Sequence, residues 1–410
     1  MESAEPLDPL WKDLPGPRAV MAALGAEKGL ARFVGGCVRN TVMALPITDI
    51  DIATVHPPEE TMRMLEGSGI TAKPTGIAHG TVTAIIKGQP FEITTLRRDL
   101  ETDGRHAVVA FTDDWAEDAA RRDFTMNAMF MDLEGEILDP TGGQQDAVDG
   151  RVRFVGDPTL RIHEDALRIL RFFRFHAQYG RTPLDQAGLQ ACERNAGPQN
   201  ALPGERIRSE LQKLLSARGA VAVVRAMDEA DILKPLFPRG LEVRMLERLI
   251  ALETKLIGDQ GDVLRRFAVL VGSNSATVLE RLRFSNKDRL RLGLMNADHL
   301  NLDASEADLK IKLYRLGSGR FIDAVLVSAA RHDGKTSQVQ AVLEIQGRWT
   351  VPRFPLRGAD LITLGLAPGA RVGRILAKIE EYWIADGMRG SHEACLSQAR
   401  NAIEQDRIKP

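Results

Sequence analysis

The segment FVGGCVRNTVMALPITDIDIAT, residues 33–54, combines a pair of glycines with two closely spaced aspartates. The apolar residues before Gly35 predict the end of a strand, and Gly35 and Gly36 allow the backbone to turn sharply into a helix that carries Arg39. Backbone N–H groups at such a turn and a nearby guanidinium are suited to hold a triphosphate. A tight turn before a helix also explains the two glycines, so they leave both interpretations open.

The two aspartates, Asp49 and Asp51, lie in a run of apolar and β-branched residues that predicts a strand over 47–54. Residues i and i+2 of a strand point to the same face, about 6.5–7 Å apart, so both carboxylates are expected to project together. Such a pair repels itself unless cations lie between the carboxylates, and two metal ions suit phosphoryl transfer. Oxygen ligands favour Mg²⁺. An exposed pair on an edge strand is the alternative.

A third carboxylate, Glu92, lies in the predicted strand 91–95 with the sequence FEITT. Phe91 and Ile93 on either side of it are expected to face the core. Glu92 then points toward the cleft of the two aspartates from a neighbouring strand, as a metal ligand or a base. A solvated strand residue is the alternative.

Length and composition indicate a globular protein with more than one core: 410 residues, 44% hydrophobic and 27% charged. The three cysteines are far apart and lack metal spacing, which argues against a disulfide framework or a zinc site. The net charge of −2 gives no basic footprint, so an RNA-binding surface must be local. No stretch approaches the roughly 18 apolar residues of a membrane helix, and the acidic N-terminus is unlike a signal peptide. We predict a cytoplasmic protein without a membrane partner.

The chain has two compositional regimes. Up to about residue 155, strands are predicted at 31–34, 47–54, 80–86, 91–95 and 108–111, with helices at 58–65, 114–121 and 123–131. Later segments are helical: 161–179, 206–217, 219–230, 242–255, 263–271, 275–282, 286–300, 306–316 and 370–386. Residues 318–360 give no clear pattern. The architecture expected is a mixed α/β head followed by an all-helical remainder.

The segment RIHEDALRILRFFRFHAQYG, residues 161–180, is the strongest helical pattern. Its arginines recur at every third position: Arg168, Arg171 and Arg174. Apolar residues surround the whole wheel, and a helix that is apolar on every side is normally buried. Buried arginines need anions, and only Glu164 and Asp165 lie nearby in the sequence. A nucleotide phosphate is therefore expected as their partner, with an intrahelical Asp165–Arg168 pair as the alternative.

Taken together, the motifs resemble the class II CCA-adding tRNA nucleotidyltransferases, whose head bacterial poly(A) polymerases share. The matching motifs are GGCVRN at 35–40, DID at 49–51, HGTV at 79–82, FEITTLR at 91–97, RRDFTMNAM at 121–129 and EDALR at 164–168. The resemblance covers roughly residues 30–215. It implies an N-terminal extension and first helix (1–30), an α/β nucleotidyltransferase head (31–155), an all-helical base-recognition neck (156–217) and a helical body and tail (218–410) that binds tRNA.

Residue roles follow from the same resemblance. It implies that Asp49 and Asp51 bind Mg²⁺, with Glu92 as the third catalytic carboxylate. It implies nucleotide contacts by Gly35, Gly36, Arg39, Arg122, Asp165, Arg168, Arg171 and Arg174. Within this set Asp165 and Arg168 read the Watson–Crick edge of the base, while Asp123 and Asn127 hold the geometry of their own motif. Asn40 departs from the aspartate usual in the family.

The implied activity is addition of CCA to the 3′ end of tRNA from CTP and ATP, with the acceptor and TΨC arms gripped by the body. Scattered basic residues between 265 and 291 are candidates for phosphate contacts or ordinary solvated faces. Residues 97–111 occupy the place of the family's flexible loop, which favours CCA addition. The alternative is a poly(A) polymerase, although the chain lacks a strongly basic tail. No protein partner is evident, and the His332-Asp333 pair is weak support for a second metal site.

Overall fold

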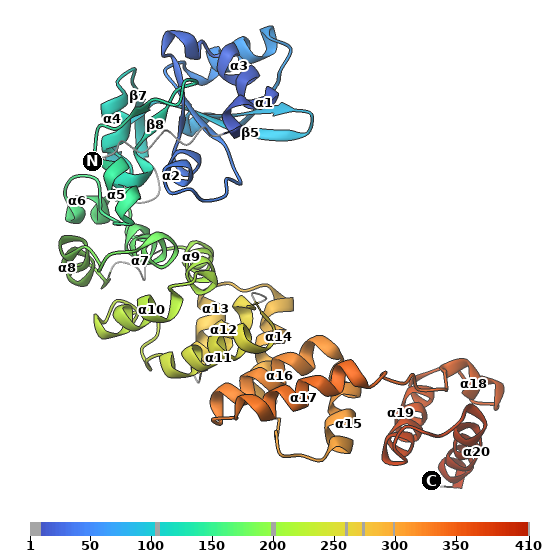
Figure 1. Ribbon diagram of the computed structural model, residues 1–410. Coiled ribbons are helices and arrows are strands. Elements are labelled where there is room, and N and C mark those ends of the chain that lie inside the picture. The colour runs from blue at the N-terminus through green and yellow to red at the C-terminus, as the bar shows by residue number, and fades with distance from the viewer. Residues whose placement is uncertain are drawn as a thin grey trace. The chain divides into compact units, whose positions relative to one another are not determined.

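The computed structural model describes residues 10–102, 107–197, 202–258, 261–272, 275–297 and 300–408 (Figure 1). The chain divides into two compact units. Unit one contains Met1–Val243 and Leu270–Ser285, and unit two contains Arg244–Val269 and Asn286–Pro410. The predicted head and neck both fall inside unit one, whereas the domain boundaries proposed from the sequence stay predictions.

The head of unit one is built on a seven-stranded mixed sheet with the order β3-β4-β5-β2-β1-β8-β9. Its strands are β1 (Ala31–Val34), β2 (Asp51–Thr54), β3 (Thr71–Gly76), β4 (Thr81–Ile86), β5 (Gln89–Thr95), β8 (Phe130–Met131) and β9 (Ile137–Leu138). Strand β2 runs antiparallel to β1 and parallel to β5. This register pairs Asp51 with Glu92 across neighbouring strands, as the predicted cleft requires.

A separate two-stranded hairpin follows the sheet. It consists of β6 (Arg97–Thr102) and β7 (Ala107–Phe111), which pair antiparallel. The segment predicted as a flexible loop therefore contains paired strands, and its residues 103–106 lie outside the described residues. The head helices are α1 (Pro15–Ala23), α2 (Gly36–Val42), α3 (Pro58–Gly67), α4 (Trp115–Ala120) and α5 (Gly143–Asp149).

Two local predictions in the head were wrong. The strand predicted from residue 47 begins only at Asp51, so Asp49 lies in the exposed segment before it. The helix predicted over 123–131 is instead a 3-10 turn, Thr125–Asn127, followed by β8. The reason lies in hydrogen bonds that compete with a helix. The Asp123 carboxylate accepts from the Phe124 N–H at 2.8 Å, and β8 pairs with β1.

The neck contains α6 (Pro158–Glu164), α7 (Leu167–Tyr179), α8 (Gln186–Arg194), α9 (Gly204–Ser216) and α10 (Ala220–Glu229). The prediction of one helix over 161–179 was wrong, because the chain breaks at Asp165. This residue has extended backbone angles, φ −151° and ψ 104°, and its carboxylate accepts from the Leu167 N–H at 3.1 Å. Helix α7 packs on α9 and α10, and its phenylalanines Phe172 and Phe173 are fully buried. The expectation of a buried helix is confirmed.

The remainder of the described chain is helical, as expected. Its helices are α11 (Val243–Leu256), α12 (Val263–Val271), α13 (Ser275–Arg281), α14 (Asn286–Ala297), α15 (Glu306–Leu316), α16 (Ser318–Arg331), α17 (Thr336–Arg348), α18 (Gly358–Thr363), α19 (Ala370–Ala385) and α20 (His392–Ile408). The unclear region 318–360 thus consists mostly of α16 and α17. Within the described residues, no helix is long and apolar enough to cross a membrane.

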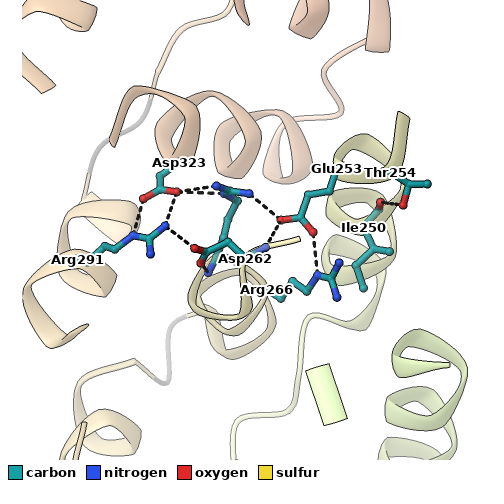
Figure 2. Close-up of polar contacts among 8 residues, drawn as sticks. Ile250, Glu253, Thr254, Asp262, Arg266, Arg291 and Asp323 are labelled. Carbon is teal, nitrogen blue, oxygen red and sulfur yellow. Dashed lines mark hydrogen bonds and ion pairs between the residues drawn. The ribbon is translucent and has the colours of Figure 1, made fainter. Parts of the chain in front are cut away.

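A buried charge network lies in unit two (Figure 2). Arg265 donates to Glu253 at 2.8 Å and to Asp323 at 3.1 Å, and the two carboxyl-bearing residues are 0% and 2% exposed. Arg266 also donates to Glu253, at 2.8 Å. Arg291 donates to Asp323 at 2.8 Å. Three of the basic residues considered for phosphate contacts are therefore paired inside the protein, which corrects that reading for them.

Candidate active site

A pocket of about 390 Å³ lies in unit one, where the head meets the neck. It is lined by Gly35, Gly36, Arg39, Arg121, Arg122, Asp123, Asn127, Asp165, Arg168, Arg171 and Phe175. Seven of the eight residues predicted to bind the nucleotide are in this set, although they come from segments more than a hundred residues apart in sequence. Five guanidiniums against two carboxylates give the lining an excess of positive charge, which suits a polyanionic ligand.

The three predicted catalytic carboxylates gather around the start of β2. Burial raises the pKa of Asp51 to about 6, and the charges of Glu92 and Asp49 add to that rise while Arg122 opposes it. Asp51 is half-buried, whereas Asp49 and Glu92 are exposed. Asp49 accepts a hydrogen bond from the Thr48 hydroxyl at 3.0 Å. The charges of Glu92 and Asp49 thus act on Asp51, although Asp49 lies before the strand and not in it as predicted.

A divalent cation fits this donor set by its chemistry. Carboxylate oxygens are the ligands that Mg²⁺ prefers, and a cation would offset both the burial of Asp51, the main cause of its raised pKa, and the repulsion that adds to it. The type of ligand atom suits the cation, but these atoms are not arranged as a complete metal site. Among the described residues, no three acidic, histidine or cysteine side chains converge as a ready metal cage.

The two glycines leave the entrance to the carboxylates open. Gly35 has a φ of 73°, in the left-handed region that favours glycine. A Cβ atom at Gly35 would lie 4.0 Å from an oxygen of Asp51 and 3.9 Å from a nitrogen of Arg122. Gly35 therefore keeps side-chain atoms out of the space between this carboxylate and this guanidinium.

Among the described residues, the hydrogen-bond acceptors of Arg39 are all neutral. Its guanidinium donates to Asn127 at 2.6 Å, to Asn40 at 2.9 and 3.1 Å and to the Tyr179 hydroxyl at 2.9 Å. It lies 4.1 Å from the centroid of the Tyr179 ring, and the residue is 7% exposed. Burial lowers the pKa of Arg39. A buried cation without a carboxylate on its nitrogens favours the approach of an anion.

Arg121 and Arg122 share one buried carboxylate. Asp118, 1% exposed, accepts from Arg121 at 2.6 and 2.9 Å through one oxygen and from Arg122 at 2.8 and 3.0 Å through the other. Burial alone would raise the pKa of Asp118, but the two guanidiniums lower it below its ordinary value. The fork holds both arginines at the pocket.

Asp123 and Asn127 link the head to the neck. Asp123 accepts from the Asn127 amide at 3.0 Å and from Arg171 at 2.8 Å. Burial opposes ionisation of Asp123, but the charge of Arg171 and the bond from Asn127 lower its pKa overall. Asn127 in turn accepts from Arg39. These contacts agree with the expectation that Asp123 and Asn127 hold the geometry of their motif.

Asp165 and Arg168 both line the pocket. The Arg168 N–H donates to the Asp165 carbonyl at 2.9 Å, but no bond between the two side chains is found among the described contacts. Asp165 accepts from Arg206 at 2.7 Å. Arg168 pairs with Glu164 and donates to the backbone carbonyls of Arg161 and Arg121 at 3.0 Å each. The intrahelical Asp165–Arg168 alternative is therefore replaced by partners from α6, α9 and the end of α4.

The argument that the neck arginines require a bound anion was wrong for two of them. Arg174 donates to Glu210 at 2.6 Å, is buried, and is not among the residues that line the pocket. Arg171 is paired with Asp123. Both carboxylates lie far away in the sequence, so a search of neighbouring positions misses them. Arg171 still lines the pocket, whereas Arg174 packs 4.0 Å from the centroid of the Phe175 ring.

Comparison with known proteins identifies the family. Residues 31–153 match the Poly A polymerase head domain, and residues 184–242 match the probable RNA and SrmB-binding site of polymerase A. The mitochondrial CCA tRNA nucleotidyltransferase 1 of Danio rerio is 33% identical over 389 residues, which cover 89% of this chain and 86% of that protein. This chain belongs to the CCA tRNA nucleotidyltransferase family.

Other members of the family support the same conclusion. The CCA-adding enzyme of Latilactobacillus sakei subsp. sakei is 30% identical over 387 residues, covering 90% of this chain and 94% of that enzyme. The crystal structure of the Bacillus stearothermophilus CCA-adding enzyme in complex with CTP matches with a TM-score of 0.71 and 25% identity, covering 96% of this chain and all of that one. The resemblance and the fold inferred from the motifs are confirmed.

Asn40 is the position where this CCA tRNA nucleotidyltransferase family member departs from the usual motif. Its side-chain oxygen accepts from Arg39, and its amide donates to the Pro46 carbonyl at 2.7 Å. An ionised aspartate is unable to donate that second bond. Asn40 therefore ties the pocket arginine to the segment that leads to Asp49.

Sequence reasoning missed Asp118 and Phe175. Asp118 precedes Arg121 and Arg122 by three and four positions, the helical spacing at which side chains meet, so the signal was present. Phe175 was read only as a core residue. Its ring lies within 5.5 Å of the guanidinium carbons of Arg39, Arg171 and Arg174, and this arrangement becomes visible only in three dimensions.

Proposed function

We propose that this protein adds CCA to the 3′ end of tRNA without a nucleic-acid template, using CTP and then ATP and releasing pyrophosphate. The activity is that of the family to which the chain belongs. The observation that carries the assignment of the site is the pocket in which Gly35, Arg39 and Arg122 of the head meet Asp165 and Arg168 of the neck. One nucleotide bound there contacts phosphate-binding and base-binding groups together.

Asp165 and Arg168 select the base. The carboxylate accepts from the exocyclic amine of cytosine or adenine, and the guanidinium donates to ring acceptors. Uracil and guanine present the opposite pattern at that edge, and each lost bidentate contact costs about 1–3 kcal/mol. Arg168 is oriented for this task by Glu164 and by two backbone carbonyls. Arg206 supports Asp165 from α9.

The triphosphate lies against Arg39, Arg122 and Arg171. Arg39 supplies a buried charge with no carboxylate on its nitrogens, while Asp118 and Asp123 orient the other two guanidiniums. Gly35 and Gly36 provide a surface free of side chains next to these donors. We assign Arg174 to the support of Phe175 and Glu210 rather than to the nucleotide.

Asp49 and Asp51 hold the divalent cation expected of the family, which we propose is Mg²⁺, with Glu92 as the third carboxylate. Bound metal ions supply activation of the attacking 3′-oxygen and charge neutralisation of the leaving pyrophosphate. The raised pKa of Asp51 leaves it ionised, and able to bind a cation, above about pH 6.

Helices that follow the neck are proposed to grip the acceptor and TΨC arms of tRNA. Exposed basic residues on α14 suit phosphate contacts: Lys287 and Arg289. The cytoplasmic location stays a prediction, since relatives include proteins named as mitochondrial.

The deciding experiment is incubation with Mg²⁺, CTP, ATP and a tRNA that lacks its 3′ CCA. We expect extension by three nucleotides followed by arrest. A long adenylate tract would support the poly(A) polymerase alternative, and no extension at all would overturn both.

Base selection has its own test. Replacing Asp165 or Arg168 by alanine should relax the preference for CTP and ATP over UTP and GTP by roughly 5- to 150-fold. Arg208→Ala is the matched control on α9, because its guanidinium donates to the Leu282 carbonyl at 3.2 Å and does not line the pocket. Unchanged discrimination in the Asp165 and Arg168 variants would contradict the assignment.

A further inference from the structure

Two aromatic residues near the end of α7 contact the guanidinium of Arg39. Phe175 and Tyr179 are four positions apart, the helical spacing at which side chains lie side by side, and their ring centroids are 5.5 Å apart. The guanidinium carbon of Arg39 lies 4.1 Å from the centroid of the Tyr179 ring and 5.3 Å from that of the Phe175 ring. The Tyr179 hydroxyl also accepts from Arg39 at 2.9 Å. A cation of the head is therefore held against two rings of the neck.

Three guanidiniums surround the Phe175 ring, and they differ in their partners. Those of Arg171 and Arg174 lie 5.4 and 4.0 Å from the ring centroid, and each forms an ion pair with a carboxylate. The third is that of Arg39, whose hydrogen-bond acceptors among the described residues are neutral. Burial is the main cause of the lowered pKa of Arg39, and the charge of Arg174 acts in the same direction. The surroundings of Arg39 thus disfavour its charge unless another group stabilises it.

Aromatic faces stabilise a cation without neutralising it. The face of a ring is the negative part of its π-system, and it attracts a guanidinium most strongly where water is excluded. A carboxylate at the same place would also stabilise Arg39, but it would occupy the N–H donors and cancel the charge that a phosphate requires. Arg39 and Phe175 both line the pocket, so the cation is held at the place where an anionic ligand enters.

Packing in the core explains one of the two rings better than the other. Phe175 is 4% exposed and lies 5.0 Å from the ring of Phe124, so a place in the core accounts for its burial. Tyr179 is half-buried, and its described side-chain contacts are those with Arg39 and Phe175. The contact with Arg39 is therefore the main feature that distinguishes Tyr179 from an ordinary residue at a helix end.

We propose that Tyr179 and Phe175 are positioning residues, which hold Arg39 in place for the phosphates of the incoming nucleotide while leaving its charge available. The two rings act through Arg39 and not on the base. Loss of a ring should therefore weaken the binding of CTP and ATP alike and leave the selection among bases unchanged. This inference rests on the proposed function, in which Arg39 contacts the triphosphate.

Tyr179→Leu tests the proposal by removing the closer ring. We expect KM for both CTP and ATP to rise roughly 2- to 30-fold with little change in kcat, the range for a lost cation–π contact. The dissociation constant of inorganic tripolyphosphate, a probe with phosphates and no base, should rise by a similar factor. Tyr179→Phe keeps the ring and loses one hydrogen bond, so its effect should be smaller. Phe173→Leu is the matched control on α7, because Phe173 is fully buried and its described ring contact is with Phe172.

A double-mutant cycle separates an action through Arg39 from a general loosening of the pocket. In the Arg39→Gln background, Tyr179→Leu should change the affinity for tripolyphosphate by less than about twofold, because the ring acts only through the guanidinium. If Tyr179→Leu fails to fold, Phe175→Leu in the same two backgrounds makes the same comparison.

Three outcomes would overturn the proposal. They are independent, multiplicative effects of the Arg39 and Tyr179 substitutions, an unchanged affinity of Tyr179→Leu for tripolyphosphate, and equal effects of Tyr179→Phe and Tyr179→Leu. A wild-type protein that binds tripolyphosphate but adds no CCA would instead overturn the proposed function.

Discussion

Two regions of this molecule are rich in arginine–carboxylate pairs, yet they differ in how fully the arginines are matched by carboxylates. In unit two, Arg265, Arg266 and Arg291 are matched by three carboxylates, those of Glu253, Asp262 and Asp323 (Figure 2). In the pocket of unit one, five arginines line the surface against two aspartates.

The difference separates charge used for structure from charge available to a ligand. A buried network whose charges cancel holds helices together, and breaking it leaves an unpaired charge in the interior. In the pocket, Asp118, Asp123 and Glu164 orient four of the five lining guanidiniums. Among the described residues, the fifth, that of Arg39, is hydrogen-bonded to neutral groups. Arginine content therefore says little about function until the partners are known.

The largest effect on activity is expected from the loss of the Asp51 carboxylate. Asp51→Ala should lower CCA addition by roughly a thousandfold or more, because several kcal/mol of charge stabilisation is lost. The incorporation of labelled CTP measures the loss, and tRNA binding by filter retention should stay within about twofold of wild type. Undiminished turnover with Mg²⁺ would contradict the role of Asp51.

The role of the charge network in unit two is tested by removing one of its charges. Glu253→Gln should destabilise unit two by about 3–5 kcal/mol, since Arg265 and Arg266 lose a buried anion. Urea denaturation measures the change. Glu344→Gln on α17 is the control, because its exposed pair with Arg348 at 3.9 Å contributes less than about 1 kcal/mol. Equal stabilities of the two variants would contradict the larger contribution assigned to the buried network.

Within unit one, Arg39 and Arg174 test the difference between an arginine that binds a ligand and one that stabilises the fold. Arg39→Gln should raise KM for both CTP and ATP about 10- to 100-fold, the range expected for a lost charge-assisted contact. Arg174→Gln should instead lower the unfolding free energy, because buried Glu210 loses its partner at 2.6 Å and keeps only the more distant Arg171, at 3.8 Å, among the described ion pairs. Steady-state kinetics and denaturation on both variants check the assignment, which fails if the two residues exchange these effects.

The smallest effect is the pH dependence of the metal-free protein. The folded pKa of Asp51 is about 6, above its ordinary value of 3.8, so the unfolded chain releases this proton first. Stability is therefore expected to fall as pH rises from about 4 to about 6, by about 1–2 kcal/mol after allowance for solvent screening. Thermal melts of wild type and Asp51→Asn in a chelator test this. The fall attributed to Asp51 should vanish in the variant, and Mg²⁺ should raise the wild-type melting temperature at pH 8 more than at pH 5.

Local patterns predicted much of the fold. Strand β1 was predicted residue for residue, and β4, β5 and most of the later helices lie within a few residues of the predicted ranges. Errors occurred where side chains bond their own backbone. Asp165 ends α6 and Asp123 diverts the next segment from a helix, and the periodicity of apolar residues contains no information about either event.

By itself, the sequence determined the family, the mixed head with a helical remainder, and the chemistry available at each motif. These depend on short-range spacing, as with Gly35 before a helix or Asp51 within a strand. Only the tertiary structure decided which charges are neutralised. Arg171 meets Asp123 across 48 positions and Arg174 meets Glu210 across 36, whereas the acceptors of Arg39 in the described part of the chain are neutral. Hydrogen bonds and charge interactions depend on distance in space, and sequence spacing does not specify that distance between segments so far apart.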